Sequence, residues 1–348
     1  MRGKKVWKIY DVKTSTSLDE RHIIETAFKV DTIKAKYPEV KIEAYIMYIN
    51  KEYVLDKELD VEEFFITENV TSTLRHVQPL VDRYSRLATK VFEMNEVPVT
   101  SIGTKCSSPF DCEFKNHCWK NVPENSVFEI SRLWEIKKFQ MYDQGIVKLE
   151  DVPRNVKLNE KQWMQIDCTV QNRQIIDPVA IGRFLEKIEY PISAMDFETC
   201  QPIIPIYQKT KPYQHTPIQF SVHRIDSENS PLLHYEFLHD GGMREVRINF
   251  MNRLNEAVGE TGTILVYNKK FEEARLKEIA KVYTPFKEDI DNIISRMIDL
   301  MEPFDQRYLY HPAQKGSASL KVVLPAWVPE LSYKDLEIFG GASASEEF

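Results

Sequence analysis

The stretch Met195-Asp196-Phe197-Glu198-Thr199 is the most informative part of the chain. It ends an apolar run that includes Ile192 and Ala194, as is typical of a buried strand. Because side chains on a strand alternate between its two faces, Asp196 and Glu198 project to the same side. Two carboxylates this close raise each other's proton affinity unless a cation lies between them, and a divalent metal ion is the usual cation. The alternative is a solvated strand end without a ligand.

A second β-rich run, residues 263–267, is followed by residues with helical periodicity. Apolar side chains at positions 271, 274, 276, 279 and 280 predict an amphipathic helix. We expect this helix to begin near Asn268, a residue type favoured as an N-cap. Glu272 then lies in its first turn, and we expect this third carboxylate to face Asp196 and Glu198.

These segments resemble the motifs of the DnaQ-like 3′–5′ exonucleases. Asp-Phe-Glu-Thr at 196–199 is similar to their first motif. Tyr-Asn-Lys-Lys-Phe-Glu at 267–272 is similar to their second, in which Asp is usual where Glu272 stands. Residues 217–222 and 296–300 resemble two further core strands, the later one with an Asp that is usually structural. The resemblance begins near residue 190 and implies an RNase H-like (DnaQ-type) mixed sheet with flanking helices.

The resemblance implies hydrolysis of DNA or RNA with two Mg²⁺ or Mn²⁺ ions. Asp196 and Glu198 would hold these ions, with Glu272 as a further ligand. The third motif of these enzymes lies on a last helix that carries a catalytic Asp. No such pattern precedes the carboxyl end of the sequence, so we expect this end to be incomplete.

Two residues outside the acids are predicted to bind substrate, Asn268 of the second motif and Lys321. Ser317 is expected to cap a short helix, whose free N–H groups could bind a phosphate within reach of Lys321. An ordinary capped helix without a ligand is the alternative.

The composition indicates a globular protein, since 43% of its 348 residues are hydrophobic and 11% are aromatic. The formal net charge is −7, and residues 1–120 contain 19 basic and 19 acidic residues, so the deficit lies in residues 121–348. This balance argues against tight non-specific binding of duplex nucleic acid. The sequence contains no run of 18 apolar residues and no signal-peptide pattern, so no membrane partner is expected and a cytoplasmic location is the default.

Three of the five cysteines form a cluster, Cys106, Cys112 and Cys118, with five residues between neighbours. An odd number of cysteines does not suggest disulfides, and such a cluster in a reducing compartment favours a metal or iron–sulfur centre. Zinc is the alternative metal, with His117 as a fourth ligand, although adjacent residues rarely both reach one ion. Chance clustering of three thiols is the third interpretation.

In the amino-terminal segment, Asp11 and Lys13 stand two residues apart on a predicted strand, and a helical pattern and a second strand at 42–49 follow. This order resembles the RecB-type (PD-(D/E)XK) nuclease core, in which the acid binds the metal ion and the lysine positions the attacking water. The cysteine cluster resembles part of the four-cysteine [4Fe–4S] site of such nucleases. Their preceding metal-binding acid and fourth cysteine are missing, and Lys29 stands where Gln is usual, so we expect this end to be incomplete too.

The predicted architecture is therefore an α/β protein in three parts. A RecB-like restriction-endonuclease-type fragment with the cysteine cluster covers 1–120, a helical connector covers 121–190, and a DnaQ-like exonuclease domain covers 191–348. Connector helices are predicted at 130–139, from Asn159, and from Asp177-Pro178. Nearly the whole chain resembles an uncharacterised bacterial family in which a RecB-type half with an iron–sulfur cluster precedes a DnaQ-like half.

The expected activity is that of a metal-dependent nuclease acting on nucleic acid, with single-stranded ends as substrate. The first alternative is a fragment that binds nucleic acid without cutting it, because both ends lack acids. The second is a zinc-stabilised scaffold.

Overall fold

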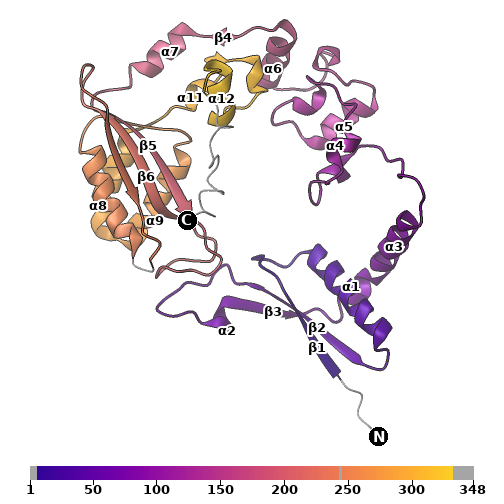
Figure 1. The fold of residues 1–348 in the computed structure, drawn as a ribbon. Coiled ribbons are helices and arrows are strands. Elements are labelled where there is room, and N and C mark those ends of the chain that lie inside the picture. Colours follow the sequence, from indigo (N-terminus) through magenta and orange to yellow (C-terminus); the bar gives the residue numbers. More distant parts are fainter. Residues whose placement is uncertain (1–5, 243–244, 332–348) are drawn as a thin grey trace. The chain divides into compact units, whose positions relative to one another are not determined.

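The computed structural model describes residues 6–242 and 245–331, which divide into two units (Figure 1). The first unit contains the described residues of 6–99, 200–216 and 241–245. The second contains 100–199, 217–240 and 246–331. The cysteine cluster and the expected connector thus group with the later part of the chain, and the predicted domain boundaries at 120 and 190 stay predictions. The predicted α/β class is confirmed.

The first unit is a three-stranded sheet covered on one face by helices. Its strands, in the order β1-β2-β3, are β1 (Val6–Val12), β2 (Lys41–Ile49) and β3 (Phe65–Asn69), with β1 parallel and β3 antiparallel to β2. Its helices are α1 (Glu20–Lys36), α2 (Val61–Phe64) and α3 (Leu74–Phe92). Alternate β2 side chains, Ile42, Ala44 and Ile46, are buried in one cluster with Ala27 of α1 and Val81 of α3. The strand–helix–strand order expected after Asp11 is confirmed.

A loop of the second sheet belongs to this first unit. Residues 200–216 connect two strands of the second unit, yet the Leu55 N–H donates to the Thr210 carbonyl at 3.0 Å and the Lys209 N–H donates to the Leu55 carbonyl at 2.7 Å. Tyr213 packs against a small apolar cluster that includes Tyr53 and Phe64. The first unit is therefore assembled from segments far apart in the sequence.

The second unit contains a five-stranded mixed sheet in the order β7-β6-β5-β8-β9. β8 is parallel to both β5 and β9, and β7 is antiparallel to β6. The strands are β5 (Ile192–Cys200), β6 (Thr216–Ile225), β7 (Leu233–Leu238), β8 (Thr263–Val266) and β9 (Met297–Asp299). The second unit therefore has the mixed sheet that the sequence predicts.

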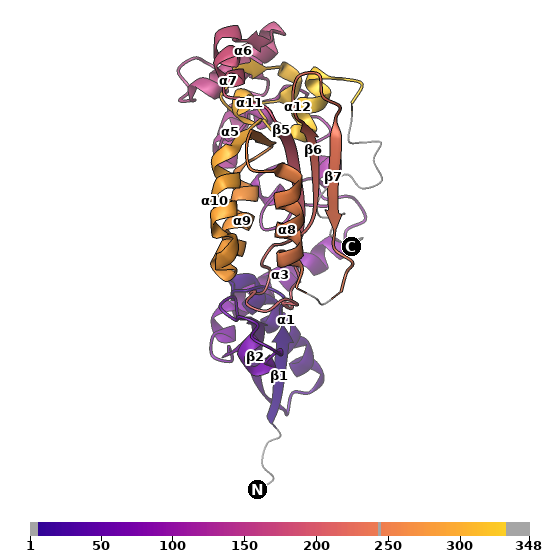
Figure 2. The same ribbon diagram turned by 90° about the vertical axis from the view of Figure 1, so that its left-hand side faces the viewer.

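One face of this sheet forms the main core. Met195 and Phe197 of β5 and Phe220 and Val222 of β6 pack in a single cluster with buried side chains of three helices. These helices, α8 (Val246–Val258), α9 (Lys270–Val282) and α10 (Lys287–Arg296), lie together on one side of the sheet (Figures 1 and 2). Because strand residues alternate, Asp196 and Glu198 point to the opposite face.

The expected connector packs around its own small core and against later elements of the same unit. Val127, Ile130 and Ile166 belong to that core, and β4 pairs with β10. The remaining elements of the unit are η1 (Thr104–Cys106), α4 (Lys115–Cys118), η2 (Val127–Glu129), α5 (Glu135–Asp143), η3 (Leu149–Asp151), α6 (Glu160–Gln171), β4 (Ile175–Ile176), α7 (Pro178–Leu185), η4 (Thr284–Phe286), α11 (Glu302–Asp305), β10 (Leu309–Tyr310), η5 (Pro312–Gln314) and α12 (Leu320–Trp327).

Two of the three predicted connector helices begin where expected. The Asn159 side chain accepts from the Gln162 N–H in a capping box that opens α6, and Asp177 caps α7 before Pro178 at its first turn. The helix predicted from residue 130 begins only at Glu135, because the preceding residues form a turn in which Arg132 has φ +53°. None of the helices within residues 6–242 and 245–331 is long and apolar enough to span a membrane.

Candidate active site

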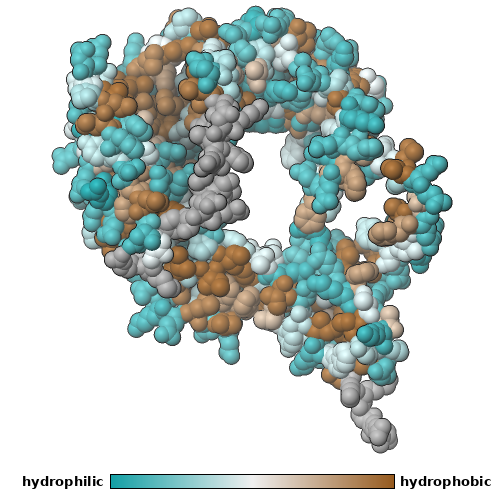
Figure 3. Space-filling model, in the orientation of Figure 1, coloured by the Kyte–Doolittle hydropathy of each residue, from teal (hydrophilic) through white to brown (hydrophobic). Residues whose placement is uncertain are grey.

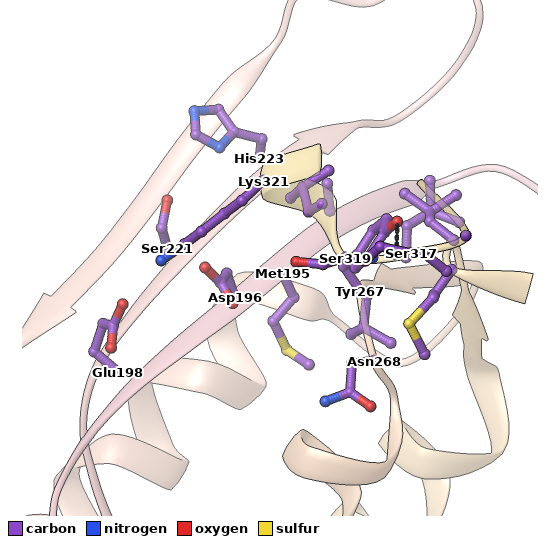
Figure 4. Close-up of a pocket in the computed structure, with 18 of the residues that line it drawn as sticks. Met195, Asp196, Glu198, Ser221, His223, Tyr267, Asn268, Ser317, Ser319 and Lys321 are labelled. Atoms are coloured by element: carbon purple, nitrogen blue, oxygen red, sulfur yellow. Dashed lines mark hydrogen bonds between the residues drawn. The ribbon is translucent and has the colours of Figure 1, made fainter. Parts of the chain in front are cut away.

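The side chains of Asp196 and Glu198 line a pocket of about 840 Å³. This pocket lies on the uncovered face of the second sheet, the face opposite to helices α8, α9 and α10. Figure 4 shows both acids on β5, with Ser221 of the neighbouring strand β6 beside them. The pocket is bounded by β5, β6, β8 and the segment that leads into α12; its other lining residues include Ser131, Arg132, His223, Tyr267, Asn268, Ser317, Ser319 and Lys321. The strand alternation predicted from the sequence therefore places both acids in one cavity.

The two carboxyls in this pocket hold their protons more tightly than usual. Burial by the surrounding protein raises the pKa of Asp196, although its side chain remains accessible to solvent, and a backbone hydrogen bond at Phe197 opposes this shift. Burial also raises the pKa of Glu198; the charge of Asp196 adds to the increase and the charge of Lys321 reduces it. A site that raises the pKa of adjacent acids favours a cation that could take the place of the protons.

Glu272 is the third predicted acid, and it lies in the first turn of α9 as expected. Its side chain is only 3% exposed, and its Oε2 atom has no hydrogen-bond partner among residues 6–242 and 245–331. Burial raises the pKa of Glu272 to about 7; a backbone hydrogen bond opposes the shift, while the charges of Asp196 and Asp299 increase it. A buried carboxyl oxygen without a partner is unusual and indicates either a bound proton or a ligand that completes the site.

Asp299, at the end of β9, has a structural role in this site. Its carboxylate accepts hydrogen bonds from the N–H groups of Asn268 at 2.9 Å, Lys269 at 3.0 Å and Met301 at 2.9 Å. Asn268 lines the pocket with φ +72°, and α9 starts at Lys270 with Lys269 at its N-cap position. The prediction that Asn268 caps α9 is therefore wrong, because the carboxylate that holds the start of this helix comes from β9.

Asp196 and Glu198 line one pocket and Glu272 lies outside its lining, so the three acids do not form a ready-made metal centre in the described structure. The charge of Asp196 raises the pKa of both Glu198 and Glu272. In the part of the chain that the structure describes, no three His, Cys, Asp or Glu side chains are arranged to hold a metal ion. The donor set consists of hard carboxylate oxygens, which suits Mg²⁺ or Mn²⁺. The Oε2 atom of Glu272 supplies a further oxygen that accepts no hydrogen bond from the part of the chain that the structure describes.

Lys321 and the segment before it form another wall of the pocket. Figure 4 shows the Lys321 side chain extending from α12 toward Ser221 and Asp196. The Tyr267 hydroxyl donates to the Ala318 carbonyl at 2.6 Å, which ties the end of β8 to this segment. Lys321 is thus a cation in this wall of the pocket, and its charge opposes the rise in the pKa of Glu198.

Ser317 does not cap α12. The N-cap position is occupied by Ser319, whose side chain makes no capping hydrogen bond, and the Ser317 hydroxyl instead accepts from the Ser319 N–H at 3.1 Å. The prediction of a Ser317 cap is wrong because this hydroxyl is used one turn earlier, in the segment before the helix. Both serines nevertheless line the pocket.

The sequence reasoning missed several pocket residues. Ser221 of β6 lies between the buried Phe220 and Val222, His223 follows Val222, and Arg132 comes from the expected connector. Arg132 also donates to Asp305 at 3.0 Å, which anchors it beside the cavity. The alternation Phe220-Ser221-Val222-His223 carried the signal for β6, because its polar positions share a face once the apolar positions are assigned to the core.

Comparison with protein families identifies one region. Residues 193–319 match the family described as a domain of unknown function, DUF2779. The comparisons with curated proteins and with solved structures gave no match. The DUF2779 region contains Asp196, Glu198, Asn268 and Glu272, and it ends just before Lys321. The family match therefore covers most of the pocket and adds no statement about its chemistry.

Outside the DUF2779 region, Asp11 lies in a network of charges in the first unit. Its side chain is 7% exposed and accepts hydrogen bonds from Thr26 at 2.8 Å and from Lys29 at 2.8 and 2.9 Å. Lys13 lies 3.4 Å from Asp11 and also pairs with Glu25. Burial acts to raise the pKa of Asp11. The hydrogen bonds from Lys29 and Thr26 and the charges of Lys13 and Lys29 outweigh this effect and keep the pKa below its usual value.

This network shows what the two sequence-predicted residues do in the described structure. Asp11 and Lys13 do lie together, as the Asp-x-Lys spacing predicts. Both Asp11 oxygens, however, already accept hydrogen bonds from Lys29 and Thr26. Two cations neutralise the carboxylate, so it has less need of a metal ion than the acids of the DUF2779 region.

The cysteine cluster lies in a short, irregular part of the second unit. Cys106 ends η1 and is buried, Cys112 follows in a loop, and Cys118 ends α4; all are free thiols. The Cys112 N–H donates to the Cys106 carbonyl at 2.9 Å, which folds the loop back on itself. Among the residues that are described, neither these thiols nor His117 form part of a group of three metal ligands. The iron–sulfur and zinc interpretations stay predictions.

Proposed function

We propose that the second unit is a metal-dependent nuclease that hydrolyses phosphodiester bonds of DNA or RNA, acting as a 3′–5′ exonuclease on single-stranded ends. The observation that carries this proposal is the buried carboxyl of Glu272, whose Oε2 has no hydrogen-bond partner among the described residues. Its pKa is raised in part by the charge of Asp196, which lines the open pocket together with Glu198. Structural carboxylates are normally satisfied by hydrogen bonds, as Asp299 is here.

The resemblance to the DnaQ-like exonucleases supports the proposal at the level of elements. The first motif lies on β5, the second at the start of α9, and the segment 217–222 lies on β6 beside β5. Asp299 is held by backbone N–H groups, consistent with the structural role that the resemblance implies for it. An RNase H-like fold is part of this proposal.

Asp196, Glu198 and Glu272 would hold the Mg²⁺ or Mn²⁺ ions. When bound, such ions lower the pKa of an attacking water and stabilise negative charge on the leaving oxygen. The protein's own groups have separate tasks. Lys321 partly offsets the negative charge of Glu198, and Asn268, fixed by its backbone bond to Asp299, lines the side of the pocket next to α9. The acids need the cations before a phosphodiester, itself an anion, can approach them.

The test is the shortening of a 5′-labelled single-stranded oligonucleotide in Mn²⁺. We expect D196N and E272Q to lower the rate at least about 100-fold, because each removes a ligand for charge stabilisation worth several kcal/mol. E228Q, an exposed acid on the turn after β6, is the matched control and should cut like the wild type. Equal rates in all four proteins, or shortening that survives a chelator, would refute the proposal.

A second candidate function is binding of nucleic acid without cleavage. The observation that favours it is that no three-ligand metal group exists within residues 6–242 and 245–331. Retention of a labelled strand at every Mn²⁺ concentration, with no shortened product, would support binding alone.

In the first unit, Asp11 would be the metal ligand and Lys13 the residue that aids the water, as the RecB-type resemblance implies. The residues present fit this role poorly, because Lys29 and Thr26 occupy both oxygens of Asp11. We derive no reaction step at this place and assign the proposed hydrolysis to the second unit.

A further inference from the structure

The uncovered face of the second sheet carries a row of polar side chains that extends beyond the acids. The register pairs Ser221 of β6 with Glu236 of β7 and His223 with His234. Their neighbours in sequence, Phe220, Val222, Tyr235 and Phe237, pack in the core on the other face. The polar row on this face is Asp196, Glu198, Ser221, His223, His234 and Glu236. The proposed hydrolysis uses only its β5 end.

The two histidines form an exposed aromatic platform at the far end of this row. Their ring centroids are 4.4 Å apart and their planes differ by 12°, so the imidazoles are stacked. The Ser221 hydroxyl lies 3.1 Å from His234 Nε2, which fixes the orientation of that ring. Both histidines are exposed, and His223 also lines the pocket. Because His234 holds the imidazole of His223 in place on one face, the other face of His223 is pre-organised to stack on a second aromatic ring.

The distance from the acids suits the adjacent nucleotide of a bound strand. Neighbouring strands lie about 4.8 Å apart, so β6 is about 5 Å and β7 about 10 Å from β5. If the scissile phosphodiester lies over Asp196 and Glu198, the next nucleotide reaches the level of His223. Figure 4 shows His223 and Glu198 on opposite sides of Ser221 along this wall of the pocket.

The surrounding charges favour a base over a phosphate at the histidines. Glu236 lies opposite Ser221, and Asp196 and Glu198 lie on the other side of β6, so three acids flank the platform, while Lys321 is a cation on the α12 side of the pocket. A second phosphate would be repelled there, whereas a neutral aromatic base would not. Stacking on an aromatic side chain requires an unpaired base and tolerates any base, because every base has a π-face.

We propose that His223, supported by His234, stacks on the base of the nucleotide next to the scissile bond, and that the substrate class is therefore single-stranded nucleic acid without sequence preference. This inference rests on the proposed function only for the position of the scissile bond. It assigns a substrate-binding role to two residues that no motif of the chain includes.

The test measures binding in Ca²⁺ in place of Mn²⁺, because this hard cation neutralises the carboxylates, does not favour imidazole ligands and is expected to support no cleavage. The probes are a short 5′-fluorescein-labelled oligothymidylate and the same strand with an abasic residue next to its 3′-terminal nucleotide, followed by fluorescence anisotropy. Stacking predicts that H223A weakens binding of the intact strand about tenfold. H223F, which keeps a ring, should bind within about twofold of the wild type. H76A, at an exposed histidine of α3 in the first unit, is the matched control.

The abasic strand provides the second half of the test. We expect it to bind the wild type about as weakly as H223A binds the intact strand, and we expect no further loss when the two changes are combined. Unchanged affinity in H223A, or an equal loss in H223A and H223F, would overturn the stacking role. Thermal unfolding of both variants near the wild-type temperature shows that folding is not the cause.

The outcomes separate this inference from the proposed function. Wild-type protein that shortens the strand in Mn²⁺, together with H223A that binds normally, leaves the nuclease proposal intact and refutes the subsite. Wild-type protein that binds through His223 but never shortens the strand refutes the nuclease proposal and retains the subsite.

Discussion

At the scale of single residues, Glu272 is the buried carboxyl of the candidate site whose ionisation is most unfavourable. Its carboxyl is 3% exposed, and one oxygen has no hydrogen-bond partner among the residues that the structure describes. Such a group is stable only as the neutral acid or beside a cation. Its pKa of about 7 means that the folded protein binds a proton that the unfolded chain has already released at that pH. The stability of the metal-free protein must therefore depend on pH through this residue.

The E272Q variant tests this dependence. For a raised acid pKa, the folded state is favoured below the unfolded value near 4.5 and loses this advantage as the pH rises through about 7. In a chelator at pH 8, E272Q should be more stable than the wild type by up to about 3 kcal/mol, and the difference should shrink toward pH 5. Urea unfolding at the two pH values measures it. Parallel stability curves would show that Glu272 titrates normally.

Gly262 provides a residue-scale prediction about the sheet itself. It has φ +83°, and an added Cβ would overlap backbone atoms of Pro191 at the start of β5. G262A should therefore cost at least about 2 kcal/mol, because both the backbone conformation and the contact oppose it. Gly103 has extended backbone and no atom near an added Cβ, so G103A should change stability by less than about 0.5 kcal/mol. Equal effects in chemical denaturation would contradict the geometry.

At the scale of secondary-structure elements, α3 is amphipathic over a greater length than its contact with α1 requires. Its first half buries Leu74 and Val81, whereas Leu87, Val91 and Phe92 are exposed, and Figure 3 shows apolar surface over this helix. The apolar face thus continues along both halves of α3, but it is buried in the first half and exposed in the second.

Substitutions along α3 separate the pattern from the packing. V81A removes a side chain that is 3% exposed and should cost about 2 kcal/mol. V91A, at a valine that is 50% exposed, should change stability by less than about 0.5 kcal/mol. Denaturant midpoints of the two variants measure the difference, and a V91A cost as large as that of V81A would mean that this face is covered in solution.

The elements also show how far the sequence could be interpreted. Strict alternation predicted β5 and placed Asp196 and Glu198 together, and the apolar period of α9 placed Glu272 in its first turn. The start of α9 was misplaced because its stabilising carboxylate, Asp299, lies 31 residues from Asn268 in the chain. Local capping rules cannot predict a cap that tertiary structure supplies.

Other parts of the site depended on contacts that no local pattern encodes. Arg132 enters the pocket from a turn of the expected connector, and Lys29 reaches across 18 positions to Asp11. Spacing alone favoured a metal ligand at Asp11, whereas the structure shows a carboxylate already neutralised by two lysines. Charge pairing of this kind becomes visible only when helix α1 is packed on strand β1.

At the scale of the whole molecule, the cysteine cluster yields a prediction that does not depend on activity. If Cys106, Cys112 and Cys118 anchor an iron–sulfur cluster, anaerobically purified protein should be brown and contain iron, and C106S should lose both properties. C168A, at a buried cysteine of α6 outside the cluster, is the control and should keep the colour. Colourless protein that contains zinc would favour the scaffold interpretation, and metal-free protein would leave three ordinary thiols.

The loop at 200–216 has a practical consequence for anyone who excises the matched region. A clone cut at residues 193 and 319 would carry Thr210 and Tyr213 away from Leu55, Tyr53 and Phe64, their partners near the start of the chain. Such a fragment would expose Tyr213 of the 200–216 loop, which packs against apolar residues of the first unit, and would also lack Lys321. A poor yield of this fragment would then result from the choice of its boundaries. A shortened β5–β6 connection, or co-expression with residues 6–99, should restore its solubility.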